Sequence, residues 1–111
     1  MPKQYDIYII EVGSEYRVRP ATVAFSRGDP CKVRNVTNKI MVLGFPANLI
    51  EDTANPATNE VVTLQGNQKN TTLKIRAGAA AGAYSYFVFT TENGKPVFAS
   101  GESDPIIIVD D

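Results

Sequence analysis

The strongest strand signal in the chain is the stretch from Gly82 to Thr91, which reads GAYSYFVFTT. Successive side chains of a strand point to opposite faces of a sheet. This run therefore places Tyr84, Tyr86 and Val88 on one face and Phe87 and Phe89 on the other. The next four residues, ENGK at 92–95, contain an Asn-Gly step that favours a tight hairpin turn. We predict that the segment from Val97 to Ala99 pairs back onto this strand.

Short β-rich runs bounded by turn residues occupy most of the remaining chain. They lie at residues 4–12, 16–19, 22–25, 31–36, 40–45, 60–64, 71–77 and 105–109. Runs of this length, without long apolar repeats of helical period, are typical of an all-β sandwich. We predict an antiparallel Greek-key sandwich of seven to nine strands, one domain over residues 1–111, with an immunoglobulin-like sandwich as the alternative.

Three local features add detail to this outline. The run from Ile40 to Phe45 is almost continuously apolar, which is typical of a strand covered on both faces or of a segment that crosses the core. Residues 46–60 are predicted to form a long loop, with one helical turn near Leu49 to Thr53. Cys31 alternates in phase with Val33, so we expect this single cysteine to be buried as a small hydrophobic residue.

The composition of the 111 residues excludes several classes of function. Eleven Lys and Arg against 12 Asp and Glu give a net charge of −1, whereas a general nucleic-acid binder needs an excess of clustered cations. The chain has no His, the commonest general base and transition-metal ligand, and one Cys, which forbids an internal disulfide. No apolar run is long enough to span a membrane. We expect a cytoplasmic protein if Met1 is the native start, and a periplasmic or secreted one if a signal was removed.

Two motifs resemble those of cupredoxins, the small blue-copper sandwich proteins. The first reads GDPCKVRNVT at residues 28–37, a Gly-Asp step followed by alternating apolar residues, an Asn and a small polar residue. The second reads GAYSYFV at residues 82–88, which is similar to the Gly-x-Tyr-x-Tyr/Phe-x-Cys of the family. A last apolar strand follows at residues 106–109. This resemblance covers residues 16–109 and implies a cupredoxin-like sandwich.

The same resemblance marks the positions at which the family binds copper. Met41 stands six residues after Asn35, where the family has its first His ligand, and Val88 stands where the family has Cys. The later His and Met of the family have no counterpart after Val88. A blue-copper site requires a thiolate and two imidazoles as equatorial donors. We therefore expect no copper and no other cofactor.

The expected function is that of a non-catalytic binding module that acts through protein–protein contact or self-association. An enzyme is disfavoured because no base and no paired carboxylates are evident, and neither nucleic acid nor membrane is an expected partner. The alternative is a domain that binds a small ligand or carbohydrate through exposed Tyr and the 46–60 loop. The residues predicted to form an interaction surface lie in that loop and at the 90–94 turn: Asn48, Asp52, Asn55, Thr90, Thr91 and Asn93.

Overall fold

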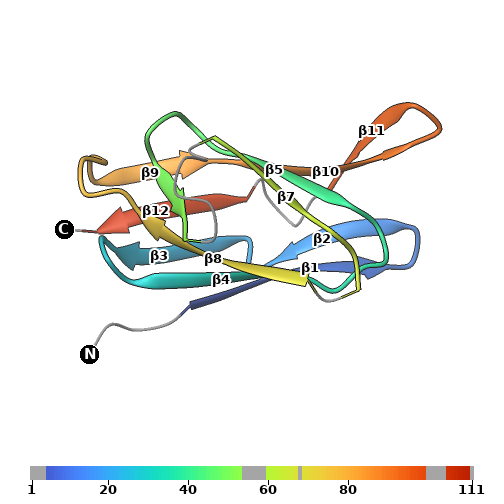
Figure 1. Ribbon diagram of the computed structural model, residues 1–111, viewed down its shortest axis with the longest axis horizontal. Coiled ribbons are helices and arrows are strands. Elements are labelled where there is room, and N and C mark those ends of the chain that lie inside the picture. Colours follow the sequence, from blue (N-terminus) through green and yellow to red (C-terminus); the bar gives the residue numbers. More distant parts are fainter. Residues whose placement is uncertain (1–4, 54–59, 68, 100–104, 111) are drawn as a thin grey trace.

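The computed structural model describes residues 5–53, 60–67, 69–99 and 105–110. Within these ranges the regular structure is entirely β, and no helix is present that could cross a membrane. The strands lie in two packed layers (Figure 1). Their bounds are β1 Tyr5–Val12, β2 Glu15–Arg19, β3 Thr22–Ser26, β4 Pro30–Asn35, β5 Met41–Gly44, β6 Ile50–Asp52, β7 Val61–Leu64, β8 Lys69–Ile75, β9 Gly82–Ser85, β10 Phe87–Glu92, β11 Lys95–Phe98 and β12 Ile106–Asp110.

The first layer is a five-stranded sheet in the order β2-β1-β4-β8-β6. Alternation decides which side chains of this sheet are buried. Cys31 and Val33 of β4 face the core, as do Leu73 and Ile75 of β8, while the lysines and arginines between them face outward. Cys31 and Val33 share the inward face, as their alternation in the sequence predicts, so period-two patterning accounts for the orientation of this strand.

The second layer combines a sheet of order β3-β12-β9 with one of order β11-β10-β5-β7. The two are continuous because β9 runs into β10 with only Tyr86 between them. At that residue the backbone N–H donates to the carbonyl of Pro105 (3.0 Å). The Tyr86 ring is buried and stacks on Phe45, with ring centroids 5.0 Å apart.

The all-β sandwich prediction is confirmed, and the structure adds two features to it. Two pairings are parallel, β1 with β4 and β12 with β3, within an otherwise antiparallel arrangement. The reason is that β3 leaves the first layer for the second, so the chain returns beside β1 in the same direction. The described strands number twelve rather than seven to nine; the run at residues 83–91 divides into β9 and β10, and the short β6 was not predicted as a strand.

One local prediction is wrong. The segment near Leu49 to Thr53 forms no helical turn; it contains the short strand β6, which extends the first layer beside β8. Leu49 and Ile50 are buried there, and the Arg76 guanidinium donates to the carbonyl of Ile50 (2.8 Å). Tertiary pairing with an existing sheet edge overrides the weak local preference of three residues. The predicted loop residues 54–59 lie outside the described ranges.

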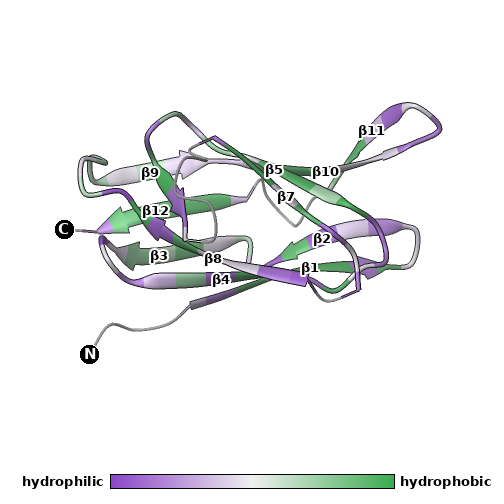
Figure 2. Ribbon diagram, viewed as in Figure 1, coloured by the Kyte–Doolittle hydropathy of each residue, from purple (hydrophilic) through white to green (hydrophobic). Residues whose placement is uncertain are grey.

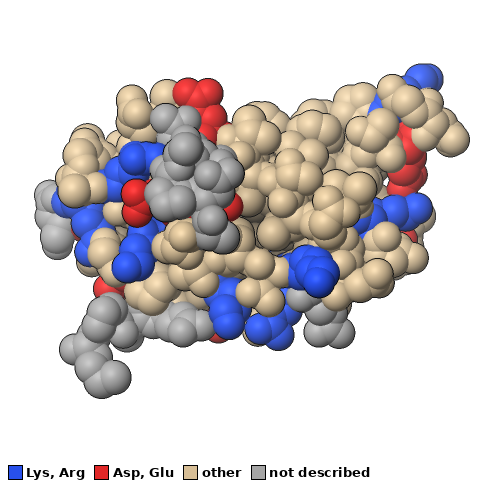
Figure 3. Space-filling model, in the orientation of Figure 1, with Lys and Arg blue, Asp and Glu red and all other residues tan. Residues whose placement is uncertain are grey.

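The two layers present outer faces of opposite character. Figure 2 shows β5 and the first half of β10 in green for hydrophobic residues, whereas β8 carries much more purple. In Figure 3 the lysines and arginines line the lower edge, where β1, β4 and β8 lie, and the area over β5, β7 and β10 is free of charge. The inner faces of both layers pack into one core. The difference between the two outer faces therefore affects what each face contacts, which is solvent or a partner.

Candidate functional site

Met41 and Val88, which the sequence resemblance matches to copper-ligand positions, lie on adjacent strands inside the core. Val88 of β10 pairs with Leu43 of β5, so Met41 is its diagonal neighbour two residues along β5. Both side chains point inward and are fully buried. One thioether and one aliphatic group supply neither a thiolate nor an imidazole, so this pair does not fit a blue-copper donor set.

The chain beyond Val88 continues as a strand. β10 runs to Glu92 and returns as β11 through a two-residue turn in which Asn93 and Gly94 have φ of 53° and 76°. Positive φ at both central residues is the type I′ geometry that matches the twist of a hairpin. The hairpin is tied to β2 because the Tyr16 hydroxyl donates to Glu92 Oε1 (2.6 Å).

Asn35 organises the turn that leads into β5, a role that its place in the sequence motif does not show. Its side-chain Nδ2 donates to the carbonyls of Lys39 (2.7 Å), Leu64 (3.3 Å) and Gln65 (3.1 Å). Its Oδ1 accepts from both the backbone N–H and the hydroxyl of Thr37 (3.1 and 2.7 Å). Asn35 is fully buried, so these bonds satisfy an amide that would otherwise be costly to bury.

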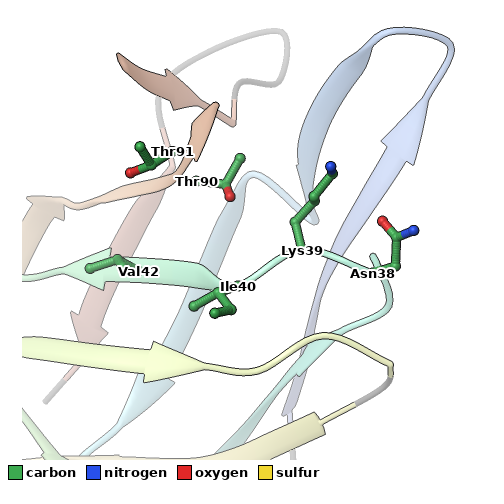
Figure 4. Close-up of a pocket in the computed structure, with 6 residues that line it drawn as sticks. All are labelled: Asn38, Lys39, Ile40, Val42, Thr90 and Thr91. Atoms are coloured by element: carbon green, nitrogen blue, oxygen red, sulfur yellow. The ribbon is translucent and has the colours of Figure 1, made fainter. Parts of the chain in front are cut away.

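A surface hollow opens where β10 parts from β5 to join β11. It has a volume of about 420 Å³ and is lined by Asn38, Lys39, Ile40, Val42, Thr90 and Thr91. Figure 4 shows these side chains on three elements, the turn after β4, strand β5 and strand β10. The lining offers one amide, one amine and two hydroxyls. None of these is a preferred donor for copper or zinc, and the described residues contain no cluster of three or more His, Cys, Asp or Glu.

Next to this hollow lies an exposed apolar surface, which we call the phenylalanine face. It is formed by outward side chains of β10, β11, β5 and β7 and of the residue before β5, namely Phe87, Phe89, Phe98, Val42, Val61 and Ile40. The three rings form one cluster, with centroids 5.9 Å apart for Phe87 and Phe89, 6.2 Å for Phe87 and Phe98 and 5.6 Å for Phe89 and Phe98. Phe87 is 48% exposed and Phe98 57%.

Strand register shows that this surface is continuous. Phe89 pairs with Phe98 on one side and with Val42 on the other, and Val42 pairs with Thr63 of β7. The remaining outward positions of these strands are Gly44, Thr91 and Pro96. The outward side chains of the four described strands thus carry no charge. Surfaces that combine aromatic rings with a lack of charge are typical of interface centres.

The sequence left two interpretations of Ile40 to Phe45 open, a strand covered on both faces or a segment that crosses the core, and the first is wrong for the single chain. Met41, Leu43 and Phe45 are buried, but Ile40 is 50% exposed and Val42 is only partly buried. The signal for the phenylalanine face was nevertheless present in the sequence. Both β5 and β10 are apolar on their two sides, whereas a sandwich strand needs apolar residues on one side only.

The residues predicted as an interaction surface do not gather in one place. Thr91 and Asn93 are exposed at the β10–β11 hairpin, while Thr90 between the layers is buried, although it borders the hollow. Asp52 is buried and accepts a hydrogen bond from the Thr71 hydroxyl. Asn55 lies outside the described residues.

Asn48 is exposed in a different region. It borders a second hollow of about 680 Å³, together with Glu51, Lys74, Ile75, Arg76, Ala77 and Gly78. This hollow lies at the β6–β8 edge of the first layer, away from the β10–β11 hairpin that holds Thr91 and Asn93. The predicted surface therefore divides into two regions of different polarity.

Cys31 is a buried free thiol on β4, as its alternation predicts. Burial, with a smaller contribution from the negative charge of Asp6, raises the pKa of the Cys31 thiol to about 12. The thiolate is the form that attacks and binds metals. Cys31 is therefore a packing residue of the core, on a strand of the first layer, whereas Met41 and Val88 lie on strands of the second.

Comparisons with solved structures show the fold. A reduced Cu(I) form of an amicyanin variant has a TM-score of 0.58 at 14% identity, covering 99% of this chain and 85% of that chain. Amicyanin from Paracoccus versutus has a TM-score of 0.56 at 14% identity, covering 96% and 81%. A multicopper oxidase has a TM-score of 0.50 at 12% identity, covering 96% and 43%. No protein-family model and no curated protein matches the sequence. The chain therefore has the cupredoxin-like fold, as its two motifs imply, and not the immunoglobulin-like alternative.

Proposed function

We propose that this protein is a cupredoxin-like binding domain that works without copper and contacts another protein through the phenylalanine face. The observation that supports this most directly is the exposure of Phe87 and Phe98 on a surface without charge. Leaving half of each of two aromatic rings in water is unfavourable. Contiguous apolar patches of this kind on a soluble domain mark sites of interaction.

Electron transfer through a blue-copper centre is not part of the proposal. The positions that the resemblance matches to metal ligands hold Met41 and Val88, and after Val88 the chain continues as strand β10 to Glu92 and returns as β11. The chain has no imidazole, and its thiol lies in the other layer. In this proposal the chain keeps the cupredoxin-like fold but lacks the donor side chains that a blue-copper site needs.

We also infer that the domain is not an enzyme. The hollow beside β10 holds Lys39, Thr90 and Thr91 but no carboxylate or thiol. A hydroxyl nucleophile needs an adjacent general base, and the hydrogen bonds described around the hollow include none from Thr90 or Thr91 to a side-chain base. Binding is therefore the function that this geometry supports best.

Site-specific cross-linking tests the proposal. A photoreactive phenylalanine analogue replaces Phe98, or in a matched control Tyr8, an aromatic residue that is 39% exposed on the opposite layer. In cells that make the protein, we expect specific adducts from position 98 and few from position 8. Equal labelling at both positions, or no adduct at position 98, would contradict the proposed contact.

A copper titration of the purified protein tests the second half of the proposal. Because neither a thiolate nor an imidazole is accessible, we expect no intense blue absorption on adding Cu(II) and no copper retained after dialysis. Copper held stoichiometrically after dialysis, with the absorption of a thiolate complex, would contradict it.

A second candidate function is the binding of a small polar ligand at the hollow beside β6 and β8. Asn48, Glu51 and Lys74 give this hollow an amide, a carboxylate and an ammonium group on one open surface. A thermal-shift screen with sugars and small anions tests it. A ligand that raises the Tm of the protein but not that of an Asn48→Ala variant would support this candidate over protein contact.

A further inference from the structure

We propose that the phenylalanine face pairs with the same face of a second copy, giving a closed two-fold dimer. This inference rests on the proposed function, because it names the partner of the same surface. It accounts for the pattern of β5, whose residues are apolar on both sides although the described chain leaves Val42 on the outer side only partly buried. A second copy would supply the missing cover.

The distribution of charge favours a copy of the same chain. Two identical surfaces bring identical charges together, so self-pairing is penalised wherever a surface carries an excess of one sign. The outward side chains of β5, β7, β10 and β11 carry no charge before the hairpin end, where Glu92 pairs with Lys95. This surface can therefore meet its own copy without like-charge repulsion.

The outer face of the first layer shows the opposite arrangement. Its outward cations exceed its outward acids: Arg17, Arg19, Lys32, Arg34 and Lys74 against Asp6, Glu15 and Glu51. Arg34 lies over the exposed Tyr8 ring, 5.9 Å from its centroid. Two such faces would repel one another. The two layers thus differ in their ability to self-associate, and only the second is suited to it.

The size of the surface sets the strength of the dimer. The exposed halves of the Phe87 and Phe98 rings leave about 100 Å² each in water. With Ile40 and Val61, which are 50% and 55% exposed, the patch falls in the range of about 300–600 Å². Two patches together bury about 600–1,200 Å², which is the lower end for specific interfaces. We therefore expect a dimer that dissociates on dilution, with a Kd in the micromolar range.

The geometry also limits the assembly to two copies. An interface that uses the same patch on both partners is satisfied once they have met, whereas contacts between different patches continue into rings or filaments. The exposed apolar side chains on the outer face of the first layer, Tyr8 and Val12, lie among an excess of cations, so a free phenylalanine face meets no uncharged surface there. A closed dimer is therefore expected rather than a filament.

Sedimentation velocity on the 111-residue chain tests the dimer, from about 1 µM to about 500 µM. The wild type is expected to change from monomer to dimer over this range. Phe98→Lys removes the most exposed ring and adds a charge, and Thr91→Arg adds a charge while keeping every ring. Each should weaken the dimer about tenfold or more. Tyr8→Lys, on the opposite outer face, should leave the dimer unchanged.

Circular dichroism and the Tm establish whether each variant is folded. If Phe98→Lys does not fold, Thr91→Arg still tests the dimer. A wild type that stays monomeric at every concentration would overturn the inference, as would a dimer that both variants leave intact or species larger than a dimer. These failures differ from failure of the proposed function. A monomer whose position 98 still cross-links to another protein rules out the dimer and keeps the contact role, whereas no adduct at all rules out both.

Discussion

The ring of Phe87 lies directly over the backbone of Gly44 on the neighbouring strand. The two residues are cross-strand partners, and a Cβ added to Gly44 would stand 2.1 Å from the Cζ atom of the ring. The absence of a side chain at Gly44 therefore creates the space in which the ring rests. This cover of a strand glycine by an aromatic ring holds Phe87 flat against the sheet, beside Phe89 and Phe98.

We predict that Gly44→Ala weakens association through the phenylalanine face while it lowers the stability of the domain only slightly. The φ of Gly44 is not positive, so alanine fits the backbone, and the half-exposed Phe87 ring can swing away from the new methyl group. We expect the free energy of unfolding to fall by no more than about 1 kcal/mol, while contact through the phenylalanine face weakens. Urea unfolding and sedimentation velocity measure the two effects. Large destabilisation with unchanged association would show that Phe87 belongs to the core and not to the contact surface.

Asn35 is predicted to be the most sensitive polar residue of the described chain. Asn35→Ala removes the donor to three carbonyls and the acceptor of Thr37, and among these it leaves the buried Leu64 carbonyl and the buried N–H and hydroxyl of Thr37 without this partner. Each unsatisfied buried group costs about 1–3 kcal/mol, so the total loss is expected to exceed about 3 kcal/mol. Urea unfolding measures it, with Asn38→Ala as a matched control in the exposed part of the same turn. Similar losses for the two variants would contradict this role of Asn35.

Much of this fold was predictable because burial in a sandwich follows alternation. Residue type and spacing alone predict that Cys31 is buried in phase with Val33 and that the Asn93-Gly94 step forms the turn of a hairpin. The direction of pairing was not predictable in this way. Alternation is the same in parallel and antiparallel strands, so the parallel pairs of β1 with β4 and β12 with β3 depend on where β3 crosses between layers.

The site was harder to predict than the fold. Polar residues in loops were expected to form the surface, but Asp52 turned inward because a hydrogen bond from Thr71 satisfies it there. The sequence shows that β5 and β10 are apolar on both sides, but it does not predict an exposed face. An apolar residue on the outer side of a strand has the same sequence pattern whether a second layer or a second molecule covers it. Only the structure shows that no layer of the described chain covers β5 and β10 on that side.

The thiol of Cys31 is predicted to be unreactive in the native protein. Its pKa is raised to about 12 by burial and by the charge of Asp6, so almost no thiolate is present at pH 8. A disulfide reagent such as dithionitrobenzoate should therefore react with the folded chain only as fast as the chain opens, and at once in denaturant. Fast stoichiometric labelling of the folded protein at pH 8 would contradict this prediction.

The bond between Tyr16 and Glu92 is predicted to make stability fall at high pH. The Glu92 carboxylate accepts from the Tyr16 hydroxyl and, together with burial and the charge of Glu11, raises the Tyr16 pKa from 10.0 to about 12. A pKa that is higher in the folded state means that the folded state holds the proton more tightly. The contribution is therefore complete below pH 10 and is lost as the pH rises toward 12.

Two variants distinguish the effect of the Tyr16–Glu92 bond on stability at high pH from the effect of the other buried groups that lose a proton there. Burial also raises the pKa values of Tyr86 and Cys31, so some alkaline loss of stability will persist in any variant that keeps them. Tyr16→Phe should lower the free energy of unfolding by about 1–3 kcal/mol at pH 7, because it removes a hydrogen bond to a charged group. Between pH 10 and 12 its stability should fall less steeply than that of the wild type. Glu92→Gln should behave in the same direction, since the neutral amide no longer opposes the phenolate. Urea unfolding measured at each pH gives the slopes, and equal slopes for all three proteins would show that the hairpin is not held to β2 by this bond.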